Sequence, residues 1–279
     1  MGDEKDTPLR SAFRRVLRLQ NRRVIIRPGR LERITGFASA ILGNAREVTV
    51  YLPAGYDESG DRRYPVLYMQ DGQNLFDAHR AYVPGNHWRL QEAADAAIGE
   101  RSARPMIIVG IDHAGPRRID EYTPVKDPTH KGGGLAADYA RFLIEELKPA
   151  IDARFRTLPD PENTGVGGSS LGGLVSLHLA LKYPNVFRRA AVMSPSVWWA
   201  NRAIVDELEE FQGPSPRMWL DVGGREGVDT LRDARELSAL IVRKGWRDFQ
   251  FYEDRRGDHS ERAWARRSRQ ALEFLFPAK

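Results

Sequence analysis

The alternation of short apolar runs with longer amphipathic segments is the sequence feature that most constrains the fold of this chain. From residue 45 onward, the short runs are rich in β-branched residues, and several are almost entirely apolar. Strands of a mostly parallel sheet have this composition because crossover helices cover both faces of such a sheet. We therefore expect an α/β fold, a mostly parallel sheet with helices on both faces. The predicted strands span residues 47–52, 66–70, 106–111, 164–168, 190–194, 218–222 and 249–252, and the predicted helices span residues 90–98, 135–155, 171–182, 202–211, 229–244 and 260–276.

This pattern continues along the chain without a break. The 279 residues contain no internal repeat, low-complexity tract or long Pro/Gly/Ser linker, and a chain of this size can bury one large core. We expect residues 23–279 to form a single domain, with antiparallel strands from residues 23–43 leading the sheet. Residues 1–22 are basic and carry apolar residues on one helical face, which predicts a separate N-terminal segment able to form a helix. The longest irregular stretch, residues 112–134, is a candidate substrate loop or lid, with Gly132, Gly133 and Gly134 as a hinge.

Composition excludes several classes of protein. The chain has no cysteine, so disulfide scaffolds, thiolate metal sites and cysteine nucleophiles are excluded. Lysine and arginine outnumber the acids by 43 to 38, but the arginines are scattered, and the denser stretches at 10–30 and 255–269 are typical of solvated faces. Nucleic-acid binding is a rival hypothesis that predicts a steep dependence on salt. The acids among the first six residues and the lack of long apolar runs favour a soluble, cytoplasmic protein without a membrane partner.

One motif indicates nucleophilic chemistry. Residues Gly168-Ser169-Ser170-Leu171-Gly172 fit the pattern G-x-S-x-G, which places a serine on a sharp turn from a strand to a helix. The bare pattern is weak evidence, but here it lies between the predicted strand 164–168 and the predicted helix 171–182. Ser170 holds the central position of this nucleophile elbow, so we predict that it is the nucleophile. A serine hydroxyl needs a base to take its proton and an acid to orient that base.

The base and the acid are expected to follow the serine in the order acid, then histidine. Of the six histidines, His259 alone lies after the last predicted strand, in a polar turn before the last predicted helix. The acid is expected just beyond the strand 218–222, where Glu226 lies in the following loop. Asp221, within that strand, is the alternative, since spacing does not decide which carboxylate reaches the imidazole.

Acyl transfer also needs two hydrogen-bond donors for the developing oxyanion. One is normally the backbone N–H after the nucleophile, which here belongs to Leu171. The second is expected from the loop after the strand 66–70, where Gly72 permits a tight turn and the N–H of Gln73 can point toward Ser170. A plain turn at the end of a strand is the alternative interpretation of that loop.

Several segments together resemble the putative esterase family of α/β-hydrolases, which includes enterochelin esterases, esterase D, feruloyl and acetylxylan esterases and the mycolyltransferases. The resemblance spans residues 45–275 and is carried by YPVLYMQDGQNLFD (64–77), EYTP (121–124), GSSLGG (168–173), SPSVWW (194–199) and HSERAW (259–264). It implies the α/β-hydrolase fold and maps the triad onto Ser170, Glu226 and His259, with Gln73 and Leu171 as the oxyanion donors. Where many relatives have a histidine before the Asp-Gly pair, this chain has Gln70.

The resemblance implies a serine esterase that cleaves a small-molecule ester through an acyl-enzyme and requires no metal or organic cofactor. A ferric siderophore, an acylated sugar and a small acyl ester all fit as substrates. An acyltransferase of the same fold, in which an alcohol replaces water, is the alternative within enzymes. A binding protein that keeps the fold without catalysis is the alternative outside them.

Five further residues are candidates for substrate binding. Trp88, Trp198 and Trp199 lie beside loops at the catalytic edge and can line an aromatic or sugar-binding pocket, although buried tryptophans are as often part of the core. Arg118 and Glu121, in the long irregular stretch, can grip a substrate or form a structural ion pair with each other.

Overall fold

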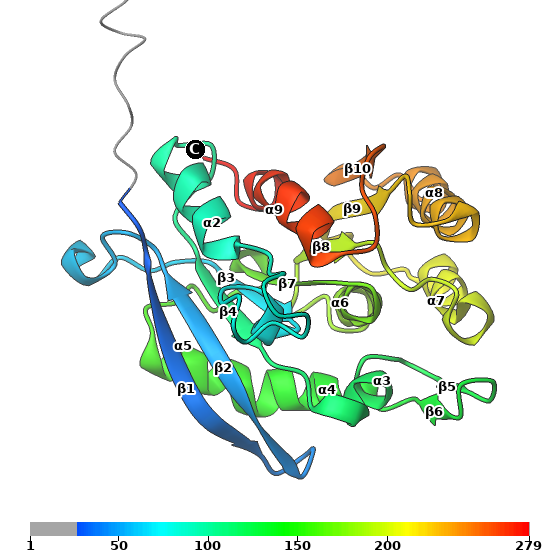
Figure 1. The fold of residues 1–279 in the computed structure, drawn as a ribbon, viewed down its shortest axis with the longest axis horizontal. Coiled ribbons are helices and arrows are strands. Elements are labelled where there is room, and N and C mark those ends of the chain that lie inside the picture. Colours follow the sequence, from blue (N-terminus) through cyan, green and yellow to red (C-terminus); the bar gives the residue numbers. More distant parts are fainter. Residues whose placement is uncertain (1–26, 279) are drawn as a thin grey trace, which may run out of the picture.

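The computed structural model describes residues 27–278, which form a central sheet of eight strands with helices on both faces (Figure 1). The order of the strands is β1-β2-β4-β3-β7-β8-β9-β10. Strand β2 pairs antiparallel with both β1 and β4, and every pairing from β4 to β10 is parallel. The strands are β1 (Arg30–Ser39), β2 (Asn44–Leu52), β3 (Val66–Gln70), β4 (Ile107–Ile111), β7 (Thr164–Ser169), β8 (Arg189–Met193), β9 (Arg217–Gly223) and β10 (Phe249–Asp254). The predicted α/β fold class is confirmed.

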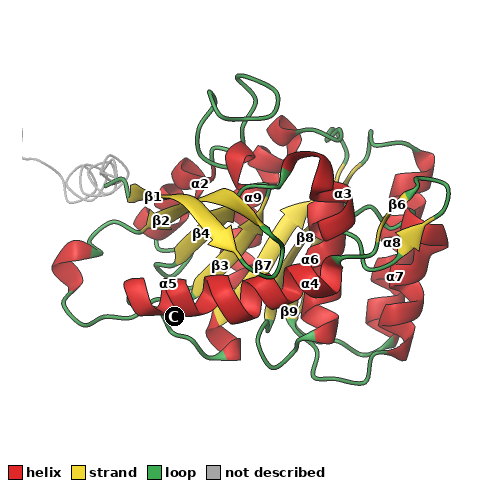
Figure 2. Ribbon diagram, turned by 90° about the horizontal axis from the view of Figure 1, so that it is seen from below, coloured by secondary structure: helices red, strands yellow, loops and turns green. Residues whose placement is uncertain are grey.

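Helices bury both faces of this sheet. Successive side chains of β3 point to opposite sides, so Val66 and Tyr68 join one apolar cluster while Leu67 and Met69 join the other. The first cluster includes residues of α4, α6, α7 and α8, and the second includes residues of α2 and α9. Figure 2 shows α4 and α5 in front of the strands on the first face. The helices are α2 (Leu90–Gly99), α4 (Ala136–Arg141), α5 (Lys148–Arg154), α6 (Leu171–Lys182), α7 (Trp199–Glu210), α8 (Val228–Arg243) and α9 (Glu261–Leu275).

The structure differs from the predicted elements in the segments 112–134 and 135–155. The helix predicted over 135–155 is α4 and α5 joined by a π-helical segment, Phe142–Leu147. The stretch 112–134, predicted to be irregular, contains α3 (Arg118–Glu121) and a small hairpin, β5 (Lys126–Asp127) paired with β6 (Gly132–Gly133). The predicted segment 1–22 lies outside the described residues. Within residues 27–278, no helix combines the length and the apolar character that a membrane span requires.

An ion pair between Arg46 and Glu121 joins the stretch 112–134 to the sheet. The Glu121 carboxylate is fully buried and accepts hydrogen bonds from Arg46 Nη1 at 3.0 Å and from Asn44 Nδ2 at 2.9 Å. Arg46 also lies over the Phe142 ring, 4.7 Å from its centroid. Glu121 therefore contacts β2 rather than Arg118, and its position is that of a structural anchor for α3.

We expect Glu121→Ala to lower the free energy of unfolding by about 3 kcal/mol or more, because it leaves a buried guanidinium without its counter-charge. Urea denaturation followed by circular dichroism measures this change. Glu145→Ala is the matched control, since Glu145 pairs with Arg141 on the surface at 3.1 Å and half of each side chain is exposed. The control is expected to lose less than about 1 kcal/mol. Equal losses for the two variants would contradict the assigned role of Glu121.

Candidate active site

Ser170 lies on a strained turn between β7 and α6. Its backbone has φ 58° and ψ −124°, a region that a non-glycine residue adopts only where its surroundings enforce it. The strand and the helix approach so closely that a Cβ added to Gly168 would lie 2.8 Å from the carbonyl carbon of Gly172. The two glycines thus permit the sharp turn that places Ser170 at the edge of the sheet formed by the carboxyl ends of the parallel strands. There the Ser170 Oγ lies 3.2 Å from Ser196 Oγ, on the loop after β8.

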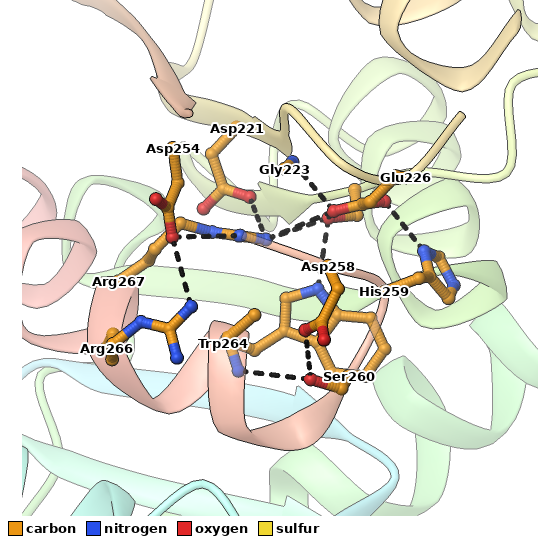
Figure 3. Close-up of polar contacts among 12 residues, drawn as sticks. Asp221, Gly223, Glu226, Asp254, Asp258, His259, Ser260, Trp264, Arg266 and Arg267 are labelled. Carbon is orange, nitrogen blue, oxygen red and sulfur yellow. Dashed lines mark hydrogen bonds and ion pairs between the residues drawn. The ribbon is translucent and has the colours of Figure 1, made fainter. Parts of the chain in front are cut away.

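His259 and Glu226 meet at the same edge of the sheet, on the loops that follow β10 and β9 (Figure 3). The two atoms His259 Nδ1 and Glu226 Oε2 are 2.7 Å apart. The Glu226 side chain is completely buried, whereas 43% of the His259 side chain is exposed. The imidazole also packs edge-on against Trp264, with 5.0 Å between ring centroids. A buried carboxylate therefore orients one nitrogen of an imidazole whose other side faces solvent.

Two glycines allow these loops to come together. A Cβ on Gly223 would lie 2.5 Å from the carbonyl oxygen of Gly257 and 2.7 Å from Glu226 Oε1. The same Gly257 oxygen accepts a hydrogen bond from the N–H of Arg225 at 2.8 Å. The acid loop and the histidine loop are thus joined through their backbones, which fixes the distance between Glu226 and His259.

The structure brings the predicted acid and base together but does not join the serine to the base. Within residues 27–278, the hydrogen bond of the Ser170 hydroxyl is to Ser196, and none connects it to His259. Catalytic hydrogen bonds are often long or misaligned in structures without substrate.

Asp221, the alternative acid, contacts a different set of groups. Its carboxylate is fully buried, accepts from Trp219 Nε1 at 2.8 Å and lies 3.0 Å from Arg267 Nη2. Burial raises its pKa to about 6, and the Arg267 charge opposes that rise. The carboxylate in contact with His259 is therefore that of Glu226.

The candidate oxyanion donors belong to the first residue of α6 and to the turn after β3. Leu171 is the first residue of α6, where a helix leaves its N–H groups without intrahelical partners. Gln73 lies in the short turn Gly72–Asn74 after β3, and that turn begins at Asp71, which has a left-handed backbone (φ 56°). Arg118 holds Asp71 in place with two hydrogen bonds of 2.7 Å to its carboxylate. Arg118 therefore supports the turn and does not pair with Glu121.

The three candidate tryptophans occupy different environments. Trp88 is buried against Trp264, with 5.8 Å between ring centroids, and Trp199 is buried with its Nε1 donating to the Val125 oxygen at 2.8 Å. Trp198 alone of the three is exposed, to 45%. Its ring lies 5.1 Å from the ring of His130, which the β5–β6 hairpin carries. Trp198 is thus the tryptophan that a ligand can reach.

Three residues that contact the candidate site were not predicted from the sequence. His130 lies against Trp198, the Ser194 hydroxyl donates to Glu226, and Arg267 pairs with Asp221. Nothing in the residues around His130 indicates that its hairpin packs on the segment before α7. Arg267 did give a signal, because it falls on the apolar face of the last helix, in step with Ala263, Trp264 and Ala271. Within residues 27–278, no cluster of three or more histidine and carboxylate side chains is arranged to hold a metal ion.

A serine at a strand-to-helix turn, on the edge of a mostly parallel sheet of this strand order, defines the fold of an α/β-hydrolase. The family described as "Putative esterase" matches residues 39–275, and this chain belongs to that family of carboxylic ester hydrolases. The crystal structure of the BES protein from Bacillus cereus has the same fold, with a TM-score of 0.72, 23% identity and 99% of each chain covered.

Two curated proteins of Bacillus subtilis illustrate the relationship. The uncharacterized protein YbbA is 26% identical over 246 residues, which cover 83% of this chain and 92% of YbbA. The ferri-bacillibactin esterase BesA is 29% identical over 163 residues, which cover 53% of each chain.

Proposed function

We propose that this protein is a serine carboxylesterase in which Ser170 is the nucleophile, His259 the general base and Glu226 the residue that orients His259. The observation that carries the proposal is the 2.7 Å hydrogen bond between the buried Glu226 and His259, beside the elbow that bears Ser170. A fixed carboxylate stabilises the imidazolium that forms when the histidine takes a proton.

Acylation begins when the Ser170 Oγ attacks the carbonyl carbon of the ester. His259 takes the serine proton on Nε2, because Nδ1 is bound to Glu226. The carbonyl oxygen becomes negative and accepts hydrogen bonds from the backbone N–H groups of Leu171 and Gln73. The intermediate then collapses, the bond to the leaving oxygen breaks, and His259 returns the proton to the departing alcohol.

Deacylation repeats these steps with water as the nucleophile. His259 removes a proton from a water molecule, whose oxygen attacks the acyl carbon on Ser170. The same two N–H groups stabilise the second oxyanion. The bond to the Ser170 Oγ then breaks, and the serine regains its proton from His259 as the carboxylic acid leaves.

We propose that the substrate carries an aromatic group, as the esters of catechol siderophores do. One relative of the chain, from Emericella nidulans, is named a siderophore enterobactin esterase. Ser196, whose Oγ contacts Ser170, is two residues before the exposed Trp198, so a bound acyl group extends from the serine toward that ring. Stacking on Trp198 beside His130 favours a planar substituent.

Ser170→Ala is expected to lower kcat by three orders of magnitude or more, the usual loss for a catalytic nucleophile. Release of p-nitrophenol from acetate, butyrate and octanoate esters measures it, with circular dichroism to check folding. Ser169→Ala is the matched control, because Ser169 is the adjacent hydroxyl and is buried in β7. A folded Ser170→Ala variant with the activity of the wild type would show that the nucleophile lies elsewhere.

Trp198→Ala is expected to lower kcat/KM for the aromatic ester methyl ferulate by about fivefold, the contribution of a stacked ring pair. The same variant is expected to hydrolyse methyl butyrate at the wild-type rate, and acid release at constant pH measures both. Trp198→Phe, which keeps a ring, is the control. Equal losses on the two esters, or no loss on methyl ferulate, would refute the proposed contact.

A further inference from the structure

A buried cluster of polar side chains lies behind the catalytic carboxylate. Arg267 projects from α9 toward Glu226, and Figure 3 shows Glu226 between Arg267 and His259. The Arg267 side chain is only 1% exposed, and those of Asp221 and Glu226 are completely buried. A buried arginine on an apolar helix face adds little to stability compared with an apolar side chain of similar size, so its presence points to another role.

The hydroxyl of Ser194 connects Arg267 to Glu226. The Ser194 Oγ accepts hydrogen bonds from Arg267 Nη2 at 2.8 Å and from Trp264 Nε1 at 3.0 Å. A hydroxyl has two acceptor sites and one proton, so the Ser194 proton is directed to Glu226 Oε1, 2.5 Å away. The N–H of Gly223 donates to the same oxygen at 2.7 Å. Two donors thus hold Oε1 of Glu226 in place, and Oε2 is left for His259.

The charges around Arg267 are unbalanced. Its guanidinium lies 3.0 Å from Asp221, 3.6 Å from Glu226 and 3.8 Å from Asp254, which Arg266 approaches from the exposed side at 3.5 Å. His259 faces Glu226 from the far side. Burial raises the pKa of Asp221, and the neighbouring Glu226 charge raises it further, while Arg267 lowers it. One guanidinium thus serves two fully buried carboxylates.

We propose that Arg267 is a positioning residue for catalysis, which keeps Glu226 aimed at His259 both directly and through the Ser194 hydroxyl. This inference rests on the proposed function, because it assigns a role through the Glu226–His259 pair. Arg267 touches no substrate. Ser194 has a left-handed backbone (φ 42°), and its N–H donates to the backbone carbonyl oxygen of Asp221 at 2.8 Å. The connecting hydroxyl is therefore itself held rigidly.

The inference predicts opposite pH effects for the two partners of this ion pair. Without Arg267, the negative charge beside His259 has lost its counter-charge and the imidazolium is favoured, so activity appears only at higher pH. With Asp221 neutralised, Arg267 acts on Glu226 alone and the imidazolium is less favoured, so activity extends to lower pH. We expect the acidic limb of the kcat/KM profile to rise by about one pH unit in Arg267→Met and to fall by a similar amount in Asp221→Asn.

The test measures kcat/KM on p-nitrophenyl butyrate from pH 4 to pH 9, at the wavelength where the phenol and the phenolate absorb equally. The double variant Arg267→Met/Asp221→Asn removes both charges and is expected to return the limb toward its wild-type position. Arg266→Met is the matched control, since Arg266 is the adjacent arginine on α9 and is half exposed. Its limb is expected to coincide with that of the wild type.

The inference would be overturned if the acidic limb of the kcat/KM profile stayed in place in both Arg267→Met and Asp221→Asn. It would also be overturned if Arg266→Met shifted this limb as far as Arg267→Met does. If Arg267→Met does not fold, the downward shift in Asp221→Asn decides, because asparagine keeps the shape of that side chain. Ser170→Ala is measured in parallel to separate this inference from the proposed function. An active Ser170→Ala variant refutes the proposed function, whereas an inactive one with unmoved limbs refutes the role of Arg267 alone.

Discussion

The side chain of Glu226 is completely buried and yet contacts an imidazole that is nearly half exposed. A buried carboxylate is strongly disfavoured unless donors and a counter-charge surround it. Here the donors are the hydroxyl of Ser194 and the N–H of Gly223, and the counter-charge is Arg267. The orientation of His259 depends on this arrangement, because Glu226 can hold the ring only while its own carboxylate is held in position.

The candidate site also requires backbone segments to approach one another closely. Gly168 and Gly172 let a strand and a helix meet at Ser170, and Gly223 and Gly257 let the acid loop meet the histidine loop. A Cβ on Gly168, Gly223 or Gly257 would lie within 3 Å of a neighbouring atom, and a Cβ on Gly172 would lie 3.1 Å from the Cβ of Gln70. The strained backbone of Ser170 is kept by the packing of β7 and α6, whose apolar side chains are buried together in the first cluster.

The parts of the protein with strong apolar periodicity were predictable from the sequence. Strand β3 and helix α6 match their predicted ranges, because buried apolar residues specify both elements without help from distant contacts. The order of residues after the serine predicts Glu226 and His259 as acid and base, but only the fold shows that the carboxylate of Glu226, rather than that of Asp221, contacts the imidazole. The pairing of Arg118 with Asp71, and of Glu121 with Arg46, depends on long-range packing that no local pattern records.

The proposed mechanism requires that Ser170 becomes acylated. A fluorophosphonate modifies activated serines covalently, so treatment with this reagent followed by mass spectrometry of the peptides identifies the nucleophile. One adduct per chain is expected, located on Ser170 and not on the adjacent Ser169. Absence of an adduct, or an adduct on another residue, would contradict this mechanism.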